Sequence, residues 1–351
     1  MLTPELNTGR LEDTHVLDTF PLLAPNEVKQ LLPLKRPEIV TNVRRGIEDI
    51  LRGKDHRKLV ITGPCSIHDP VSALEYAQQL REIQDETSNE LLIVMRTYFE
   101  KPRTTVGWKG LIHDPYLDGS EDFQRGLLLA REILVRINEL GIPCATEILD
   151  PNTPQYLADG ISWGAIGART VESQIHRQVA SGMSMPIGMK NGTWGDISVA
   201  INAMHAARKP HSFPGVNGQG LLSMVKTTGN PNTHIVLRGG ANGSNFDPET
   251  IENTRVALAE QFGLINGVLI DCSHGNSNKD HNNQPRVLSE VARQIRGGQQ
   301  GILGIMLESN ILGGNQKWDP TVRPANGLSI TDACIDIQIT RGVIHGFAQA
   351  L

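Results

Sequence analysis

The sequence predicts an α/β protein, a closed (β/α)8 TIM barrel with an N-terminal extension and a hairpin inserted before strand 6. Three observations support this fold class. Short apolar runs alternate with amphipathic stretches along most of the 351 residues, a pattern typical of parallel sheets. Eight such runs are present, and eight strands close a barrel of this class. Polar residues follow the runs throughout, whereas an open doubly wound sheet, the main alternative, gathers them near one switch point.

The expected strands and helices follow from apolar periodicity. The strands are residues 59–62, 91–95, 143–147, 162–168, 185–189, 234–237, 267–270 and 302–307. The helices are residues 71–86, 122–140, 172–182, 197–207, 248–262 and 285–295, and a last helix is expected from Ser329 to Leu351. Asp69 and Pro70 mark the start of the first of these helices, since aspartate caps helices and proline suits the first turn. His68, beside this cap, is interpreted as support for the turn. The glycine-rich connection 210–232 contains the apolar run expected to form the inserted hairpin.

Residues 1–57 are expected to be an extension that makes regulatory or oligomer contacts, and residues 58–351 the catalytic barrel. Within the extension, Ile39, Val43 and Ile47 recur at helical spacing, so this segment needs an apolar partner, either the barrel or another subunit.

Composition and charge narrow the class of protein. The net charge of −5 argues against general nucleic-acid binding. The four cysteines form no close pair, and neither a signal-peptide core nor a membrane-length apolar run is found. We therefore expect a cytoplasmic protein with reduced thiols that binds neither nucleic acid nor membrane.

Basic residues end four of the expected strands. They are Arg96, Arg169, Lys190 and Arg238, and Lys101 and Arg103 follow in the loop after the second strand. The C-terminal ends of barrel strands share one face, so these cations would converge in its mouth. Guanidinium groups suit phosphate and carboxylate oxygens, and we expect a small polyanionic ligand that carries both. Any one of these cations alone would equally suit a salt bridge at the rim.

A second set of strand-end residues has the chemistry of metal ligands. It consists of Cys65, His274, Glu308 and Asp332, which follow the first, seventh and eighth strands and lie in the last loop. This mixture of thiolate, imidazole and carboxylate suits Mn, Fe, Co or Zn better than Mg or Ca. Taken singly, Cys65 would be a small buried hydrophobe and His274 a core histidine, so only the barrel makes them a site. Glu147 ends the third strand among the cations and is a candidate for orienting a substrate or water.

From Gly63 to Cys334 the sequence resembles the type I 3-deoxy-D-arabino-heptulosonate-7-phosphate (DAHP) synthases. The resemblance is carried by Gly-Pro-Cys-Ser-Ile-His-Asp-Pro at 63–70, the basic loop 96–110 with its Lys-Pro-Arg-Thr run, Ser-Trp-Gly-Ala-Ile-Gly-Ala-Arg-Thr at 162–170, Lys-Asn-Gly-Thr at 190–193, Leu-Arg-Gly-Gly at 237–240, Asp-Cys-Ser-His at 271–274 and Ser-Ile-Thr-Asp-Ala-Cys at 329–334. The extension is similar to that of the longer, feedback-regulated branch. The resemblance implies a metal-dependent condensation of phosphoenolpyruvate with D-erythrose 4-phosphate and water, the first step of the shikimate pathway, in a homo-oligomer (dimer or tetramer).

The resemblance also implies roles for individual residues. One divalent metal per subunit (Mn, Fe, Co or Zn) would be held by Cys65, His274, Glu308 and Asp332. Phosphoenolpyruvate would be bound by Arg96, Lys101, Glu147, Arg169, Lys190 and Arg238, and erythrose 4-phosphate by Lys101, Pro102, Arg103, Thr104 and Asp332. The catalytic residues would be Lys101, Cys65, His274 and Glu147, with Lys101 as proton donor and Glu147 orienting water. An aromatic amino acid effector would bind at Ile148, Asp150, Pro154, Gln155, Met183 and Ser184.

The sequence leaves two alternative functions open. A 3-deoxy-octulosonate-phosphate synthase would use a longer aldose phosphate, and the run from Lys101 to Thr104 and the extension argue against it. A non-catalytic barrel that senses metal or phosphate would not need both sets of residues, and here both are intact.

Overall fold

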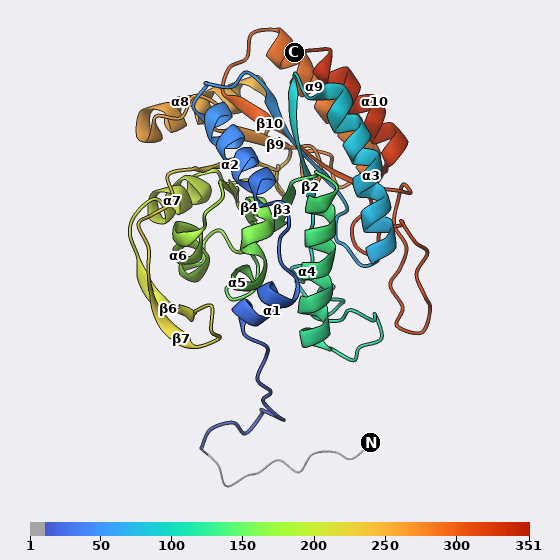
Figure 1. The fold of residues 1–351 in the computed structure, drawn as a ribbon. Coiled ribbons are helices and arrows are strands. Elements are labelled where there is room, and N and C mark those ends of the chain that lie inside the picture. The colour runs from blue at the N-terminus through green and yellow to red at the C-terminus, as the bar shows by residue number, and fades with distance from the viewer. Residues whose placement is uncertain (1–10) are drawn as a thin grey trace.

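The computed structural model of the protein describes residues 11–351, and its centre is a closed parallel barrel (Figure 1). The barrel strands are β1 (Lys58–Gly63), β2 (Leu91–Arg96), β3 (Cys144–Glu147), β4 (Ile161–Ile166), β5 (Ile187–Lys190), β8 (Thr233–Leu237), β9 (Val268–Asp271) and β10 (Ile302–Asn310). They pair in this order, and β10 pairs in parallel with β1 to close the ring. The predicted barrel is confirmed, and an open sheet is excluded.

Helices surround the barrel. The six predicted before the last one are present close to their expected positions, whereas a short helix between the third and fourth barrel strands and two 3-10 turns were not predicted. The helices around the barrel are α3 (Pro70–Thr87), α4 (Phe123–Glu139), α5 (Pro154–Leu157), α6 (Gln174–Gly182), α7 (Ser198–Ala207), α8 (Pro248–Phe262) and α9 (Gln284–Arg296), with short 3-10 turns η1 (Ala158–Gly160) and η2 (His281–Asn283). The Asp69 carboxylate accepts hydrogen bonds from the backbone N–H groups of Val71 and Ser72, so it caps α3 as expected.

The last helix was predicted to begin at Ser329, and this boundary is wrong: α10 spans Ile337–Ala348. Two competing interactions explain the difference. Gly314 and Cys334 exchange backbone hydrogen bonds of 2.8 and 3.1 Å, which hold residues before α10 against the preceding loop. Ile335 and Asp336 then form the short strand β11 beside β10, and the Asp336 side chain caps α10. Asp332 therefore lies on a loop.

The inserted hairpin is confirmed. Strands β6 (Ser212–Val216) and β7 (Leu222–Lys226) pair antiparallel between α7 and the sixth barrel strand, β8. The hairpin projects beside the barrel at the lower left of Figure 1, where Leu222 and Met224 are exposed.

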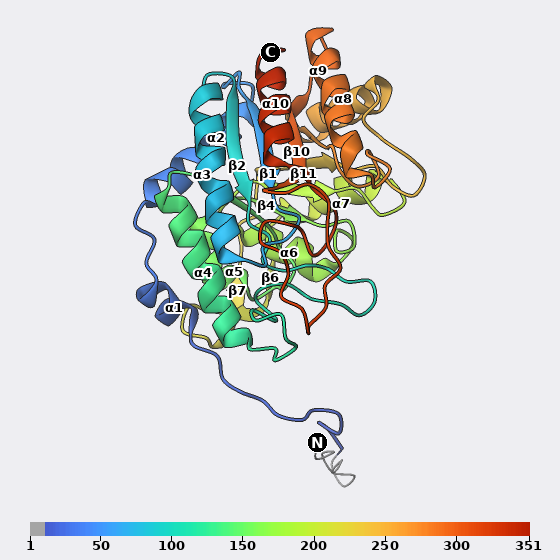
Figure 2. The ribbon, with the colours of Figure 1, turned by 90° about the vertical axis from the view of Figure 1, so that its right-hand side faces the viewer.

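The extension packs its second helix on the end of the barrel opposite the strand C-termini, and its first helix against α5 and the hairpin turn at Gly218. It contains α1 (Pro25–Leu31) and α2 (Pro37–Leu51), and Ile47, Ile50 and Leu51 of α2 are buried. The carbonyl of Leu51 accepts hydrogen bonds from the N–H groups of Ile265 and Asn266, just before β9. This arrangement supplies the apolar partner that α2 needs and leaves the opposite mouth of the barrel uncovered. In Figure 2 the described residues before α1, from residue 11 on, run away from the body. Within residues 11–351, every helix is too short or too polar to cross a membrane.

Arg131 on α4 fastens the extension to the barrel. Its side chain is 1% exposed. It donates hydrogen bonds to the carbonyls of Leu32 and Tyr156, 3.0 Å each, and to both oxygens of the Asp159 carboxylate. Burial alone would raise the pKa of Asp159, but Arg131 and then Lys29 outweigh it and lower that pKa. One guanidinium thus joins the linker after α1, the helix α4 and the turn before β4.

Replacing Arg131 by methionine should destabilise the protein by about 2 kcal/mol, because it leaves two carbonyls and a carboxylate without their donor. This loss of stability is smaller than for a fully buried ion pair, because the Asp159 side chain is 37% exposed. We expect the thermal midpoint to fall by roughly 4 °C. Arg136→Met, on the same helix but exposed, is the control and should change it little. Equal midpoints for the two variants would contradict this account of Arg131.

Candidate functional site

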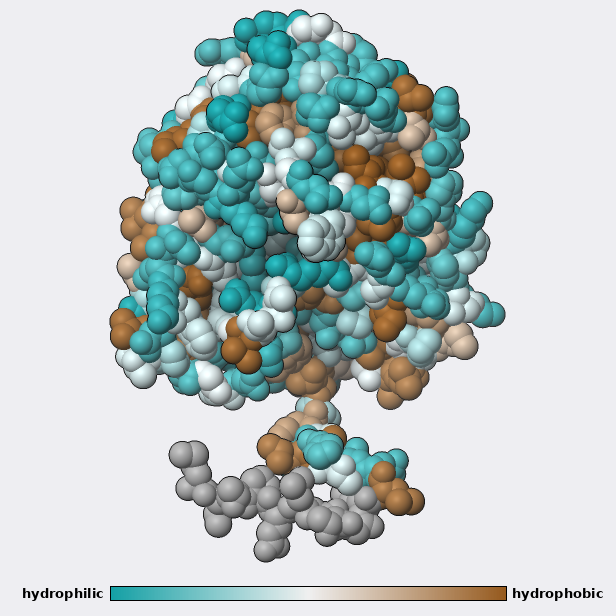
Figure 3. Space-filling view, turned by 180° about the vertical axis from the view of Figure 1, so that it is seen from behind, coloured by the Kyte–Doolittle hydropathy of each residue, from teal (hydrophilic) through white to brown (hydrophobic). Residues whose placement is uncertain are grey.

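A cavity of about 660 Å³ lies at the C-terminal ends of the barrel strands. Most of the residues predicted to bind substrates or metal line it: Lys101, Pro102, Arg103, Thr104, Glu147, Arg169, Lys190, Arg238, His274, Glu308 and Asp332. Arg96 and Cys65 are buried beside Glu308 and are not part of the lining. In Figure 3, hydrophilic side chains surround a hollow near the middle of the face shown. The barrel mouth therefore collects the two predicted sets of residues in one place, where active sites of this fold lie.

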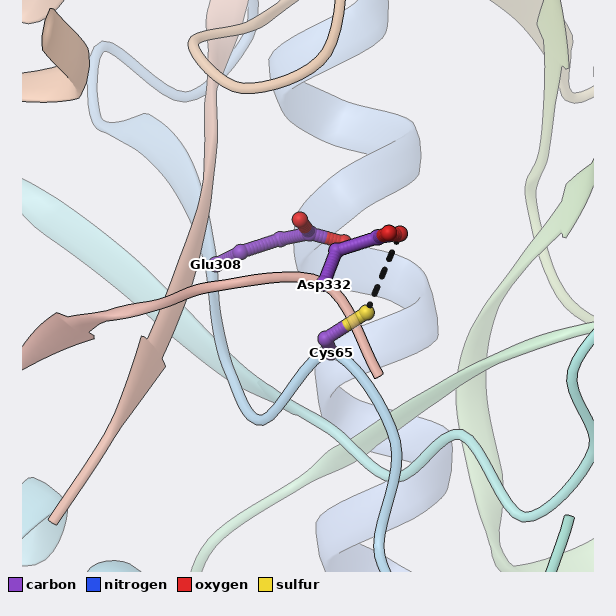
Figure 4. Close-up of side chains that lie close together, drawn as sticks. All are labelled: Cys65, Glu308 and Asp332. Atoms are coloured by element: carbon purple, nitrogen blue, oxygen red, sulfur yellow. Dashed lines mark hydrogen bonds between the residues drawn. The ribbon is translucent and has the colours of Figure 1, made fainter. Parts of the chain in front are cut away.

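Three potential metal ligands lie together at one side of this mouth. The Cys65 Sγ and one carboxylate oxygen each of Glu308 and Asp332 all lie within 4.8 Å of one another. Figure 4 shows the three side chains converging from the turn after β1, from β10 and from the last loop. The Cys65 thiol donates a hydrogen bond of 3.5 Å to Asp332 Oδ2. A thiol with two carboxylates is a donor set that suits a transition metal or zinc.

The ammonium group of Lys101 lies against the same atoms. Its Nζ is 2.7 Å from Cys65 Sγ and 3.0 Å from Asp332 Oδ2. The positive charge of Lys101 lowers the pKa of the Asp332 carboxyl group. This effect outweighs burial, which alone would raise that pKa. Burial and then Glu308 raise the pKa of the Cys65 thiol to about 12, so without a metal this group is a neutral thiol. The cluster already attracts one cation, and a divalent metal would favour the thiolate that coordination requires.

His274, the fourth predicted ligand, lies next to this cluster. Its Nε2 is 3.9 Å from Glu308 Oε1, and the ring is outside the set of mutually close ligand atoms. Its Nδ1 is 3.0 Å from Asp271 Oδ2, although the two atoms are not aligned as a hydrogen bond. His274 has a φ of 54°, a left-handed conformation that is uncommon for a residue with a Cβ and is often found at functional sites. Its role as a ligand stays a prediction.

Besides Lys101, which lies 3.0 Å from Asp332 Oδ2, two of the predicted cations have acidic partners within the protein. The Arg96 guanidinium, 1% exposed, is 3.1 Å from Glu308 Oε1 and lies over the Tyr98 ring at 4.0 Å. Lys190 Nζ is 3.2 Å from Asp271 Oδ2. These buried pairs hold both cations in fixed positions beneath the cavity.

Three other cations keep their charges available to a ligand. Among residues 11–351, Arg103, Arg169 and Arg238 make no ion pair within 4.0 Å, and all three line the cavity. The backbone N–H of Arg238 donates to Asn191 Oδ1 at 2.8 Å, which fixes the start of its loop. Uncompensated guanidinium groups around a cavity favour an anionic ligand with several oxygens.

The structure also reveals supporting residues to which we assigned no role from sequence. Asp271 is fully buried and contacts both Lys190 and His274. Burial alone would raise its pKa, but His274, Lys190 and Arg96 outweigh that effect and hold the pKa well below its usual range. Its position at the end of an apolar run was a usable signal. Gln284 exchanges two hydrogen bonds with the backbone of Glu308, at 2.8 and 2.9 Å, and no sequence signal indicated this contact.

The six predicted effector residues do not share one cavity in the structure. Ile148 and Pro154 line a hollow of about 10 Å³, which has room for about one water molecule. Asp150 Oδ1 accepts a hydrogen bond of 2.7 Å from the N–H of Asn152, in the turn that carries Gln155. Met183 is half-buried at the end of α6 and Ser184 is exposed. The effector role of all six stays a prediction.

Comparisons with known proteins agree on one family. A sequence model described as "DAHP synthetase I family" matches residues 32–344. The Tyr-sensitive phospho-2-dehydro-3-deoxyheptonate aldolase of Escherichia coli (strain K12) is 48% identical over 344 residues, which cover 97% of this chain and 96% of the relative. The Phe-sensitive enzyme of the same organism is 47% identical over 342 residues, 97% of each chain. A solved phospho-2-dehydro-3-deoxyheptonate aldolase from Francisella tularensis SCHU S4 has a TM-score of 0.91 and 45% identity, and the match covers 95% of this chain and 98% of that one.

We expect Co²⁺ to bind at the cluster and to give a thiolate-to-metal charge-transfer band, because Cys65 would lose its proton on coordination. Cys65→Ser should abolish the band. Cys144→Ser is the matched control: Cys144 is a buried cysteine whose Sγ lies 3.8 Å from the Ile142 carbonyl, which a serine hydroxyl can also use. A band that persists in Cys65→Ser would show that the metal binds elsewhere.

Proposed function

This chain belongs to the DAHP synthetase I family, and we propose that it condenses phosphoenolpyruvate with D-erythrose 4-phosphate and water to give DAHP and inorganic phosphate. One observation supports the proposal: arginines without acidic partners among the described residues and the Cys65–Glu308–Asp332 cluster lie at the same cavity. The first set suits two phosphorylated substrates and a carboxylate, and the second suits a metal. Neither rival function, the octulosonate-phosphate synthase or the sensor, accounts better for both.

Phosphoenolpyruvate would bind against Arg96, Lys101, Glu147, Arg169, Lys190 and Arg238. Arg169 and Arg238 would bind its phosphate or carboxylate oxygens directly, because their guanidinium groups have no acidic partner among the described residues. Lys190 is held by Asp271, and it would add positive charge without moving. Fixed cations of this kind bind the substrate and also stabilise the phosphate as it leaves.

A divalent metal, Mn, Fe, Co or Zn, would be held by Cys65, Glu308 and Asp332, with His274 as fourth ligand. The ammonium that already lies 2.7 Å from Cys65 Sγ and 3.0 Å from Asp332 Oδ2 supports cation binding there. When bound, the metal supplies Lewis-acid polarisation of the aldehyde carbonyl.

The aldose phosphate would lie along the loop after β2. Pro102, Arg103 and Thr104 line the cavity beside Lys101, and Asp332 Oδ2 lies 3.0 Å from the Lys101 ammonium. C3 of phosphoenolpyruvate forms the new carbon–carbon bond to the aldehyde carbon, water adds at C2, and the C–O bond to phosphate then breaks. Lys101 would donate a proton to the developing alkoxide, and Glu147 would orient the water. Positioning by this chain's cations and hydroxyls supplies the proximity that the bond-forming step needs.

Regulation and assembly form part of the proposal. The printed names of two relatives describe them as Tyr-sensitive and Phe-sensitive, and we propose that an aromatic amino acid inhibits this enzyme as well, through residues 148–155 and 183–184. We assign residues 58–351 to catalysis and residues 1–57 to contacts with other subunits in a cytoplasmic homo-oligomer. Leu17 and Phe20 support this division, since they are 80% and 78% exposed and contact with another subunit would cover them.

The purified enzyme should release phosphate only when both substrates and a divalent metal are present, and chelation should abolish the release. Arg169→Gln should raise KM for phosphoenolpyruvate at least tenfold, since one charge-assisted contact is worth about 1.5–3 kcal/mol. Arg125→Gln, exposed and outside the cavity, should behave as wild type. Faster turnover of arabinose 5-phosphate than of erythrose 4-phosphate would instead indicate the octulosonate-phosphate synthase.

Feedback is tested by adding Phe, Tyr and Trp separately to this assay. We expect inhibition by at least one, and Gln155→Ala should raise the concentration for half-inhibition at least tenfold without changing uninhibited turnover. Gln174→Ala is the control: Gln174 is exposed at the start of α6 and lies outside both segments. Indifference to all three amino acids would refute the regulatory part of the proposal.

A further inference from the structure

A second cavity, of about 390 Å³, lies outside the site described above. Three segments form it: the start of α3 with His68 and Asp69, the loop between β2 and α4 with Tyr116 and Leu117, and residues 320–326 of the loop after β10. Figures 1 and 2 both place the two loops at the same end of the molecule. None of the residues that line this second cavity lines the first.

His68 is the feature of this cavity that the fold leaves unexplained. Its side chain was expected to support the first turn of α3, but the residue is 6% exposed and its Nε2 is buried without a hydrogen-bond partner among residues 11–351. Asp69 does not supply one, since its carboxylate accepts from Val71 and Ser72. By contrast, the buried His234 accepts a hydrogen bond from Trp163 at 3.0 Å. A buried polar atom without a partner is costly, so a ligand that forms a hydrogen bond with this nitrogen would remove that cost.

The rest of the cavity indicates the charge of that partner. Arg323 makes no ion pair within 4.0 Å among the described residues, and the one acidic lining residue, Asp69, is engaged in capping α3. A buried imidazole nitrogen without a partner and a free guanidinium together favour a carboxylate.

The remaining walls indicate the body of the ligand. Leu117, Pro320, Val322 and Pro324 are apolar, and Tyr116 adds an aromatic face. Val322 and Tyr116 are 62% and 57% exposed, so a ligand with a flat apolar body would cover them. We propose that this cavity binds a small aromatic carboxylate, with its carboxylate between His68 and Arg323 and its ring against Tyr116 and the prolines.

Binding there would act on the first cavity through shared loops. The loop that carries Tyr116 also carries Lys101 to Thr104, and the loop that carries Arg323 continues to Asp332. A ligand that bridges the two loops would restrict both and would change KM for the aldose phosphate. This consequence rests on the proposed function, whereas the binding itself does not.

Calorimetric titration of the full chain with benzoate tests the binding. Saturating phosphoenolpyruvate is present, so that the cations of the first cavity are occupied. We expect one benzoate per chain and at least tenfold weaker binding in Arg323→Gln and in His68→Leu. Arg296→Gln, which removes an exposed arginine of α9, should bind as wild type. Benzyl alcohol, which lacks the carboxylate, should bind at least tenfold more weakly than benzoate.

Two results would overturn the proposal: no saturable benzoate binding, or binding that both Arg323→Gln and His68→Leu leave unchanged. Arg323 is exposed on a loop, so its variant should fold even if the His68 variant does not, and a loss of binding in Arg323→Gln alone supports the site. Since the titration involves no turnover, failure of the catalytic assay would leave its result interpretable.

Discussion

The pairing of the first barrel strand with the last is the constraint on which the site depends. In this register Gly63 lies opposite Glu308 and Leu59 opposite Gly304. A Cβ on Gly304 would lie 1.8 Å from the Leu59 carbonyl oxygen, so only glycine permits so close an approach of the two strands. Once the ring is closed there, the turn after β1 brings Cys65 to Glu308, and the last loop needs only to add Asp332. Residues from the two ends of the barrel sequence thus become neighbours through backbone hydrogen bonds alone.

Apart from Lys101, which lies against the metal cluster, charge compensation divides the cations of the site into two groups. Arg96 and Lys190 are buried and paired with Glu308 and Asp271, so neither is free to neutralise a ligand without losing a partner. Such buried pairs add little net stability, but removal of one member leaves an uncompensated charge. Arg103, Arg169 and Arg238 face the cavity without acidic partners among the described residues, and their charges remain for a ligand. The buried pairs therefore fix the floor, and the unpaired arginines provide the affinity.

The sequence was sufficient for what depends on periodicity and on strand ends. All eight barrel strands, the hairpin and the convergence of cations follow from apolar runs and the polar residues after them. The predicted start of α10 was wrong. The residues before Ile337 continue the helical periodicity, but their backbone forms hydrogen bonds with the preceding loop instead. Asp271 carried a usable signal at a strand end, whereas Gln284 contacts Glu308 from a separate helix, a relation that only tertiary structure creates. The unpartnered His68 was likewise out of reach, since a sequence does not show which polar atoms lack partners.

The position of the extension limits how any signal could reach the catalytic cavity. Helix α2 covers the N-terminal end of the barrel, while the cavity opens at the other end, so an effect of one on the other must pass through elements between them. One such link is present: Thr153 Oγ1 donates a hydrogen bond of 2.9 Å to Glu100 Oε2. Thr153 lies within the segment assigned to the effector, and Glu100 directly precedes Lys101. A ligand that displaced Thr153 would remove a buried hydrogen bond from the residue next to the proposed proton donor, so this contact is one route from the proposed effector segment to the loop that carries Lys101.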